Sequence, residues 1–382
     1  MNVAIVGGGP GGLYLALLLR RGDPSRRVRV FEQNPEGATY GWGLVFSERA
    51  LAFMHDSDPA SFADLERHLA LRPEQHVIHR GRAIVLRGTR FSAVARLELL
   101  RILHHHCRAA GVELEFERRI ASPDELAGWD LIVAADGANS ALRSALAAEL
   151  GATIALRANR YVWYGTPKPI DALSLTFREN ADGVWVAHAY RYAPDRSTFI
   201  IECDTQTFAR SGLRAMSDEQ ARAYCERVFA TELDGQPLLS NRSLWNPFAM
   251  VRTERWSSGN VVLMGDALRT AHFSIGSGTR KALEDAVALA AALAAEPKDL
   301  TASFARFRAE RGPTLQRLVD ISMTSAAWYE RVREHMRLDP VPFTYSFVTR
   351  AGHIDLERLR ERDAEFAASY EEFERSSANS ER

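Results

Sequence analysis

Apolar and polar residues follow a strand–helix–strand order in the first part of the chain. Residues 2–6 (NVAIV) are apolar and mostly β-branched and end at glycines, as expected of a buried strand. Residues 13–21 have the pattern of a helix, which Gly22 and Pro24 end, and residues 28–32 (VRVFE) follow as a second strand. This order predicts a βαβ unit with a right-handed crossover, and therefore a parallel sheet.

Helix and strand patterns continue to about residue 150. Helices are predicted over residues 47–71 and 96–110, and Gly111 ends the second of them. Strands are predicted over residues 112–116 and 129–135, and the latter is apolar enough to be buried on both faces. These elements extend the parallel sheet.

Between residues 150 and 255 the chain becomes richer in aromatic and β-branched residues. Four strands are predicted there, over residues 161–164, 173–177, 183–190 and 197–202. They indicate an antiparallel sheet that forms a second layer or domain. Beyond it, the pattern predicts a buried strand at 260–264, helices over 279–295 and 303–336, and a charged tail from 357 that frays after Phe373.

The charge balance narrows the classes of partner. The chain has 48 basic and 49 acidic side chains, whereas a general nucleic-acid binder needs a basic excess to neutralise phosphates. We therefore expect no nucleic-acid partner. Three cysteines are too few and too scattered for a disulfide framework or a structural zinc site, so a reducing, cytoplasmic setting is expected.

The first charged side chain is Arg20, so the N-terminal residues resemble a signal peptide or a membrane span. No basic segment precedes this apolar run, and residues 7–12 (GGGPGG) divide it with poor helix formers. The apolar run over residues 286–295 is shorter than the ~20 residues of a spanning helix. We expect no membrane-spanning segment.

Glycines follow the first strand at the spacing of a dinucleotide-binding turn. Gly7 makes the tight turn, Gly9 lets the backbone approach a pyrophosphate, and Gly12 lets helix and strand pack closely. The N-terminus of the helix offers unpaired N–H groups to phosphates. Glu32 ends the second strand, where a carboxylate can bind ribose hydroxyls. These residues predict a dinucleotide site.

Two further motifs come after buried strands. Asp136 begins the motif DGxxSxxR, and Asp266 lies in a Gly-Asp pair after the strand at 260–264. The turn containing Gly276 and Gly278 then leads into a helix at Thr279. An aspartate at a strand end can bind a ribityl hydroxyl, and a glycine turn at a helix N-terminus can support negative charge on a flavin ring.

In this order, the three motifs resemble those of the class A, single-component flavoprotein monooxygenases. A narrower resemblance is to the salicylyl-CoA 5-hydroxylases and the monooxygenase half of the anthraniloyl-CoA monooxygenases. It covers nearly the whole chain and rests on residues 40–47, 164–169, 177–180, 187–192, 197–203 and 265–279. Like those enzymes and the tryptophan-derived pigment hydroxylases of violacein synthesis, the chain has Phe273-Ser274 where the usual class A pattern has proline. The anthraniloyl-CoA enzymes carry a fused reductase domain. We expect hydroxylation without further ring reduction here, which favours the salicylyl-CoA reading.

Together with the element pattern, the resemblance implies an α/β fold. A Rossmann-like FAD-binding domain is expected to carry an inserted antiparallel β-sheet substrate domain and a long C-terminal helical segment. The FAD-binding domain would be discontinuous, over residues 1–150 and 256–300. The substrate domain would take residues 151–255 and the helical segment residues 301–382.

The resemblance also implies an activity. NADH or NADPH would reduce FAD, dioxygen would form a C4a-hydroperoxyflavin, and its distal oxygen would be transferred to an electron-rich ring carbon. The favoured reaction is salicylyl-CoA to gentisyl-CoA. Hydroxylation of a free indole or tryptophan-derived intermediate, a reductive FAD-binding oxidoreductase and a plain NAD(P)-dependent dehydrogenase stay open. The oligomeric state, monomer or homodimer, also stays open.

Residues in the glycine turns and at strand ends are expected to hold FAD. The first motif would bind the ADP half, an arginine at a helix start would lie near the phosphates or the ribityl chain, and the last glycine turn would face the isoalloxazine ring. The expected FAD contacts are Gly7, Gly9, Gly12, Glu32, Arg96, Asp136, Asp266, Gly276, Gly278 and Thr279.

Hydroxylation of a phenol gains from a base that removes the phenolic proton. His272 lies beside the flavin loop and can titrate near neutrality, so it is the candidate base, unless it only braces the loop. His188 and Tyr190 share one face of a strand and are candidate substrate contacts. Candidates for the CoA phosphates are Lys168, Arg178, Arg191 and Arg196.

No metal is expected. His104, His105 and His106 are consecutive on a predicted helix. Consecutive helical side chains point about 100° apart, so these three cannot converge on one ion.

Overall fold

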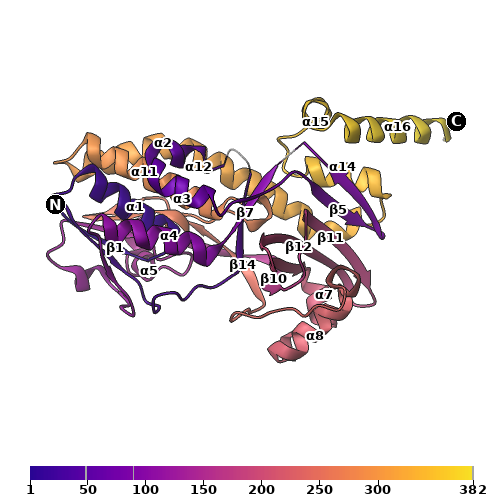
Figure 1. Ribbon diagram of the computed structural model, residues 1–382, viewed down its shortest axis with the longest axis horizontal. Helices are drawn as coiled ribbons and strands as arrows, with labels where there is room; N and C mark the ends of the chain where they lie inside the picture. Colours follow the sequence, from indigo (N-terminus) through magenta and orange to yellow (C-terminus); the bar gives the residue numbers. More distant parts are fainter. Residues whose placement is uncertain (48–49, 89, 381–382) are drawn as a thin grey trace.

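The computed structural model describes residues 1–47, 50–88 and 90–380, which form three sheets and their covering helices (Figure 1). The first sheet has six strands in the order β15-β16-β9-β1-β2-β8. Every neighbouring pair is parallel except β15 and β16. The strands are β1 (Asn2–Val6), β2 (Arg27–Phe31), β8 (Glu113–Glu115), β9 (Leu131–Ala134), β15 (Ser257–Ser258) and β16 (Val261–Leu263).

The predicted βαβ unit is present and forms the centre of this sheet. Helix α1 (Pro10–Gly22) connects β1 to β2, and it packs between α4 (Arg96–Ala109) and α11 (Gly278–Ala295). The apolar side chains of β1, and those of α1 except the partly buried Leu18, are almost fully buried, as expected for a parallel sheet covered by helices. Shorter elements of this half are α2 (Ala52–Ser57), α3 (Pro59–Glu66), η1 (Pro123–Leu126), α5 (Ala141–Ala145), α6 (Ala147–Leu150), α10 (Gly265–Leu268) and η3 (Phe273–Ile275).

The second sheet has seven strands in the order β14-β10-β13-β12-β11-β5-β6. Neighbouring strands are antiparallel except β11 and β5. The four strands expected from the aromatic region are present and are longer than predicted, as β10 (Thr153–Thr166), β11 (Leu173–Asn180), β12 (Gly183–Ala193) and β13 (Arg196–Cys203). The added strands are β5 (Gln75–His79), β6 (Arg82–Leu86) and β14 (Asn246–Arg252). A small antiparallel sheet of β3 (Gly43–Ser47), β7 (Phe91–Ala95) and β4 (Ala70–Arg72) completes the three.

Helices cover both faces of the second sheet, and each layer has its own hydrophobic core. One face packs against helices α7 (Thr205–Arg210), α8 (Asp218–Val228) and α9 (Ala230–Leu233), with η2 (Leu213–Ala215) between them. The other packs against the C-terminal helices, which Figure 1 shows on the opposite side of the sheet from α8. These are α12 (Leu300–Glu330), α13 (Val332–His335), α14 (Pro340–Thr349), α15 (Leu356–Arg362) and α16 (Ala364–Ser380).

Two expectations about helices are wrong. Residues 48 and 49 of the predicted helix 47–71 lie outside the described residues. The rest is not one helix, because Asp58 precedes a proline and has an extended φ of −154°, which separates α2 from α3. Leu71 lies in β4. The tail does not fray after Phe373, because α16 runs to Ser380, with Phe366 buried and Tyr370 stacked on Tyr345 at 3.7 Å between ring centroids.

The sheet order bears on the expected domains. Strand β16, near residue 260, does complete the first sheet, so this half of the molecule is discontinuous in sequence. The second sheet also takes β5 and β6 from the N-terminal 150 residues. The division into domains at residues 150 and 255 stays a prediction. Among the residues described, no helix is both long enough and apolar enough to cross a bilayer.

Candidate functional site

The glycine turn after β1 leaves no room for side chains at two of its three glycines. A Cβ on Gly7, whose φ is +112°, would lie 2.3 Å from the carbonyl oxygen of Ala135, and one on Gly12 would lie 2.2 Å from that of Gly7. A Cβ on Gly9 would meet nothing within 4 Å. Gly7 and Gly12 are therefore needed to form the turn itself. Gly9 is the N-cap of α1 and provides no side-chain acceptor, so the first turn of the helix has no side-chain cap.

The carboxylate of Glu32 closes this turn from β2. Its Oε2 accepts a hydrogen bond from the Gly8 backbone N–H at 2.8 Å, and its Oε1 accepts two from Asn34, from the backbone N–H at 2.9 Å and from Nδ2 at 2.6 Å. Oε2 keeps a second lone pair. Glu32 can therefore hold the loop and still accept hydrogen bonds from ribose hydroxyls.

Asp136, at the end of β9, caps the following helix. Its Oδ2 accepts a hydrogen bond from the Ala141 N–H at 2.8 Å, whereas Oδ1 is buried without a partner among the described residues. Burial raises the pKa of Asp136, and its hydrogen bonds oppose this shift. The buried Arg143 donates to the carbonyls of Ala138 (2.6 Å) and Ala267 (3.2 Å), and so ties this loop to the one that contains Asp266.

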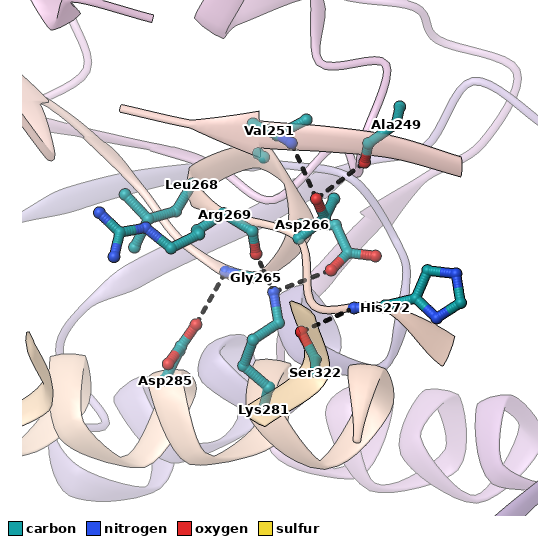
Figure 2. A network of polar contacts seen from close by, with 12 residues as sticks. Ala249, Val251, Gly265, Asp266, Leu268, Arg269, His272, Lys281, Asp285 and Ser322 are labelled. Atoms are coloured by element: carbon teal, nitrogen blue, oxygen red, sulfur yellow. Dashed lines mark hydrogen bonds and ion pairs between the residues drawn. The ribbon is translucent and has the colours of Figure 1, made fainter. Parts of the chain in front are cut away.

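A buried polar network holds the Asp266 loop (Figure 2). The fully buried Lys281 on α11 donates from Nζ to Asp266 Oδ1 at 2.8 Å and to the Arg269 carbonyl. Asp285, also fully buried, accepts from the Gly265 N–H at 3.0 Å and from Arg311 Nε at 2.6 Å. The Asp266 side chain itself is 44% exposed. The network fixes the backbone of the loop and leaves the second carboxylate oxygen of Asp266 for a ligand.

A cavity of about 640 Å³ opens between this loop, the second sheet and the segment from α14 to α15. Of the expected FAD contacts, it is lined by Arg96, Asp266, Gly276, Gly278 and Thr279. Aromatic and aliphatic side chains make up much of its remaining wall, among them Tyr161, Trp163, Phe248, Phe273, Ile200 and Leu175. Its size and apolar lining are typical of a site for a small organic ligand.

Arg96, the first residue of α4, lines the cavity. Its Nε donates to Thr39 Oγ1 at 3.1 Å. Burial lowers the pKa of Arg96, and the negative charges of Asp266 and Glu32 oppose this shift. A guanidinium at the wall of the cavity is suited to a bound pyrophosphate.

His272 does not line the cavity. Its Nδ1 accepts a hydrogen bond from the Ser274 N–H at 3.3 Å, its backbone N–H donates to Ser322 Oγ at 3.1 Å, and its ring stacks on Phe273 at 4.4 Å between centroids. In Figure 2 the ring points away from the Asp266 and Lys281 pair. This geometry favours the bracing role over the catalytic one, which stays a prediction.

Burial lowers the pKa of His272 to about 4, and the nearby Glu202 carboxylate opposes this shift. Between about pH 6.5 and 4 the unfolded chain therefore binds a proton here that the folded chain does not, so stability falls as pH falls. We expect His272→Asn, which keeps a hydrogen-bond acceptor, to reduce the slope of unfolding free energy against pH by up to about 1.4 kcal/mol per pH unit. Urea unfolding at pH 5 and pH 7 measures both slopes, and equal slopes would contradict a buried, neutral His272.

The two candidate substrate contacts on β12 do line the cavity. Tyr190 is buried, and its hydroxyl donates to the Gly43 carbonyl at 2.8 Å. Burial raises its pKa. His188 is 7% exposed and lies against the rings of Phe273 and Tyr329. The Tyr190 hydroxyl is already used in this hydrogen bond, so the imidazole of His188 is the better candidate to bind a ligand.

The candidate CoA contacts lie elsewhere, and none of them lines the cavity. Lys168 Nζ pairs with Asp234 at 2.8 Å, and Arg191 pairs with Asp171 at 2.9 Å. Arg178 and Arg196 are also paired with carboxylates. Their role with CoA stays a prediction that this geometry does not favour.

Four further residues contribute to the site and were not predicted as site residues. Arg143 stands at a fixed spacing in the motif DGxxSxxR, and Lys281 lies on the buried stripe of α11, so both left a signal in the sequence. Glu202 is a lone carboxylate in the apolar strand β13. Arg350 donates to the Ser274 carbonyl at 3.0 Å and lines the cavity, and no local pattern marks it.

Two family models match the chain. A model described as an FAD binding domain matches residues 129–322, and one described as an NAD(P)-binding Rossmann-like domain matches residues 5–68. Together they cover the three glycine and aspartate motifs.

Curated relatives extend along most of the chain. It is 38% identical to salicyloyl-CoA 5-hydroxylase from Streptomyces sp, over 96% of this chain and 72% of that protein. It is 36% identical to 3-hydroxy-4-methyl-anthranilyl-[aryl-carrier protein] 5-monooxygenase from Streptosporangium sibiricum, over 87% and 90%. It is 34% identical to protodeoxyviolaceinate monooxygenase from Chromobacterium violaceum, over 92% and 94%.

Solved structures share the fold. 2-Methyl-3-hydroxypyridine-5-carboxylic acid oxygenase superposes with a TM-score of 0.70 at 15% identity, covering 94% of this chain and 95% of that one. Pseudomonas aeruginosa PqsL in complex with 2-aminobenzoylacetate superposes with a TM-score of 0.67 at 23% identity, covering 87% and 98%. At these identities the likeness concerns the fold alone.

The residues present fit FAD. A Cβ at Gly9 would meet nothing within 4 Å, Asp136 has a buried oxygen without a partner among the described residues, and Arg96 and Asp266 line the cavity. With the two family models and the relatives above 30% identity, the chain belongs to the class A, FAD-dependent aromatic monooxygenases, which use NAD(P)H and dioxygen.

Proposed function

We propose that this enzyme hydroxylates an aromatic ring carried as a thioester, and that its substrate is salicyloyl-CoA, which it converts to gentisyl-CoA. The observation that carries the proposal is the 38% identity to a salicyloyl-CoA 5-hydroxylase over nearly the whole chain. The relative named for an aryl-carrier protein supports a tethered aromatic substrate as well.

The cavity suits such a substrate. It is bordered by the Gly276–Thr279 turn and also by α14 and α15, so it runs past the space that an aromatic ring alone needs. Its wall is mostly apolar, which excludes water from the reacting ring. We infer that the ring lies between the glycine turn and His188, and that the acyl chain leaves toward α14 and α15.

Bound FAD, reduced by NAD(P)H, supplies the activation of dioxygen. The chain provides the surroundings for that chemistry. Ser277 caps α11 without a side-chain hydrogen bond, so the first N–H groups of an 18-residue helix remain available at the glycine turn. Their partial positive charge would stabilise negative charge on the adjacent flavin ring.

Product analysis tests this proposal. The purified enzyme is incubated with NADH, air and one of three compounds, namely salicyloyl-CoA, free salicylate or an indole substrate, and NADH oxidation is followed before products are identified. We expect stimulation and a hydroxylated product with salicyloyl-CoA. Stimulation by free salicylate but not by the thioester would overturn the proposal, and an indole product would favour the relation to protodeoxyviolaceinate monooxygenase. NADH oxidation without any hydroxylated product would indicate a reductive flavoprotein.

A further inference from the structure

A buried carboxylate lies behind the cavity wall. Glu202 on β13 is 1% exposed, in a strand whose neighbouring residues are otherwise buried and uncharged. Its Oε1 accepts a hydrogen bond from Asn159 Nδ2 at 2.7 Å. Its Oε2 has no hydrogen-bond partner among the described residues and lies 3.5 Å from Nε2 of His188. A buried carboxylate is costly unless it is paired, so this arrangement calls for a cationic partner or a strong donor.

His188 stands between this carboxylate and the cavity. It lines the cavity from β12, and its Nε2 is buried, has no hydrogen-bond partner among the described residues and lies 3.5 Å from Glu202 Oε2. Its ring is held by the rings of Phe273 and Tyr329, at 5.6 Å and 5.2 Å between centroids. Because Nε2 is buried 3.5 Å from Glu202 Oε2, Nδ1 is the ring nitrogen available to a ligand. Glu202 would then fix the tautomer with its proton on Nε2 and the lone pair on Nδ1.

The surroundings keep the carboxylate charged. Burial acts to raise the pKa of Glu202, but the neighbouring His188 and the hydrogen bond from Asn159 hold it below its ordinary value. His272 on the adjacent loop is neutral near pH 7, because burial lowers its pKa to about 4. The other titratable or charged groups packed near the pair are Tyr161, Tyr329, Arg157 and Arg350. None of these supplies a second carboxylate.

We propose that His188 and Glu202 form the proton-accepting pair for the phenol of the substrate, an inference that rests on the proposed function. The phenolic O–H bond breaks and leaves its electron pair on oxygen, while an N–H bond forms at His188 Nδ1. The resulting imidazolium keeps its Nε2 proton directed to Glu202, which balances its charge. His188 is the catalytic residue and Glu202 the positioning residue. The phenolate makes the ring carbon para to it more electron-rich, as an electrophilic oxygen transfer requires.

The ionisation of a bound ligand tests this pair without turnover. FAD-loaded enzyme is titrated with salicyloyl-CoA in the absence of NADH and oxygen, and phenolate absorbance is recorded against pH. We expect the phenol pKa to fall by at least about one unit on binding to the wild type. His188→Gln and Glu202→Gln should each abolish this shift, and His188→Gln should lower kcat by about 10²- to 10⁴-fold.

His79→Gln is the matched control. His79 is a fully buried histidine on the same sheet, it does not line the cavity, and its Nε2 bonds to the Leu338 carbonyl. The His79→Gln variant should be less stable than the wild type, but the phenol pKa of salicyloyl-CoA should still fall on binding to it. If Glu202→Gln does not fold, His188→Gln decides alone. If salicyloyl-CoA bound to His188→Gln has the same phenol pKa as salicyloyl-CoA bound to the wild type, the proton-accepting pair is overturned. The proposed function would still stand. A wild type that fails to hydroxylate salicyloyl-CoA would overturn both.

Discussion

Gly12→Ala is expected to give a protein that binds no FAD and unfolds at a much lower temperature. The added Cβ would lie 2.2 Å from the Gly7 carbonyl oxygen and 3.3 Å from Ala135 Cβ. The nearest atom is backbone within the same turn, so the clash cannot be relieved by a rotamer change. Overpacking of this kind costs about 1–3 kcal/mol and more when the backbone must move. Thermal unfolding and flavin absorbance of the purified variant measure the two effects.

Gly9→Ala distinguishes an effect on FAD binding from an effect on the structure of the turn. Gly9 has an ordinary φ of −73°, and its Cβ would meet nothing within 4 Å. This variant should therefore keep the stability of the FAD-free wild type and lose affinity for FAD, because the methyl group would occupy the face that a pyrophosphate approaches. Wild-type FAD affinity in Gly9→Ala would place the pyrophosphate elsewhere. Wild-type stability in Gly12→Ala would show that the turn tolerates a side chain.

The second large effect is expected for Arg311→Met, at about 3–5 kcal/mol of unfolding free energy. Arg311 Nε donates to Asp285 at 2.6 Å, and its guanidinium also pairs with Glu284 at 2.6 Å. Asp285 is fully buried and holds the Gly265 N–H. Methionine would leave that carboxylate buried without its cationic partner. Chemical denaturation measures the loss, and weaker FAD retention should accompany it.

Arg306→Met is the control on the same helix. Arg306 pairs with Glu310 at 2.8 Å, but both side chains are about half exposed. Exposed ion pairs contribute about 0–1 kcal/mol. Equal losses for the two variants would contradict the role of burial, since the pairs differ mainly in their exposure to water.

The local parts of the fold and site could be predicted because their signals are local. The βαβ unit follows from residues 2–32, and the glycines must lie where the backbone leaves no space for a side chain. The second sheet was predicted only in part. Strand β5 pairs with β11 across about a hundred residues. Nothing in the sequence of β5 specifies that partner, because such pairing is decided by tertiary packing.

The candidate site shows the same limit. His272 is near the flavin loop in sequence, but the short turn at η3 directs its ring into the packing with Phe248 and Phe273. Glu202 carried a signal, since a single carboxylate in an apolar strand needs a partner. The identity of that partner depends on the register of β12 against β13, which pairs His188 with Ile200 and so sets the histidine beside Glu202 on the same face.

The position of β16 in the first sheet has a consequence for biosynthesis. The first βαβ unit leaves the ribosome early, yet the strand beside β9 and the arginine that fixes Asp285 follow some 230 to 280 residues later. At translation rates of about 5–20 residues per second, that interval lasts roughly 10–60 seconds. During it the nascent sheet exposes an apolar edge that a chaperone would cover. Flavin capture is thus a late event in the maturation of the polypeptide.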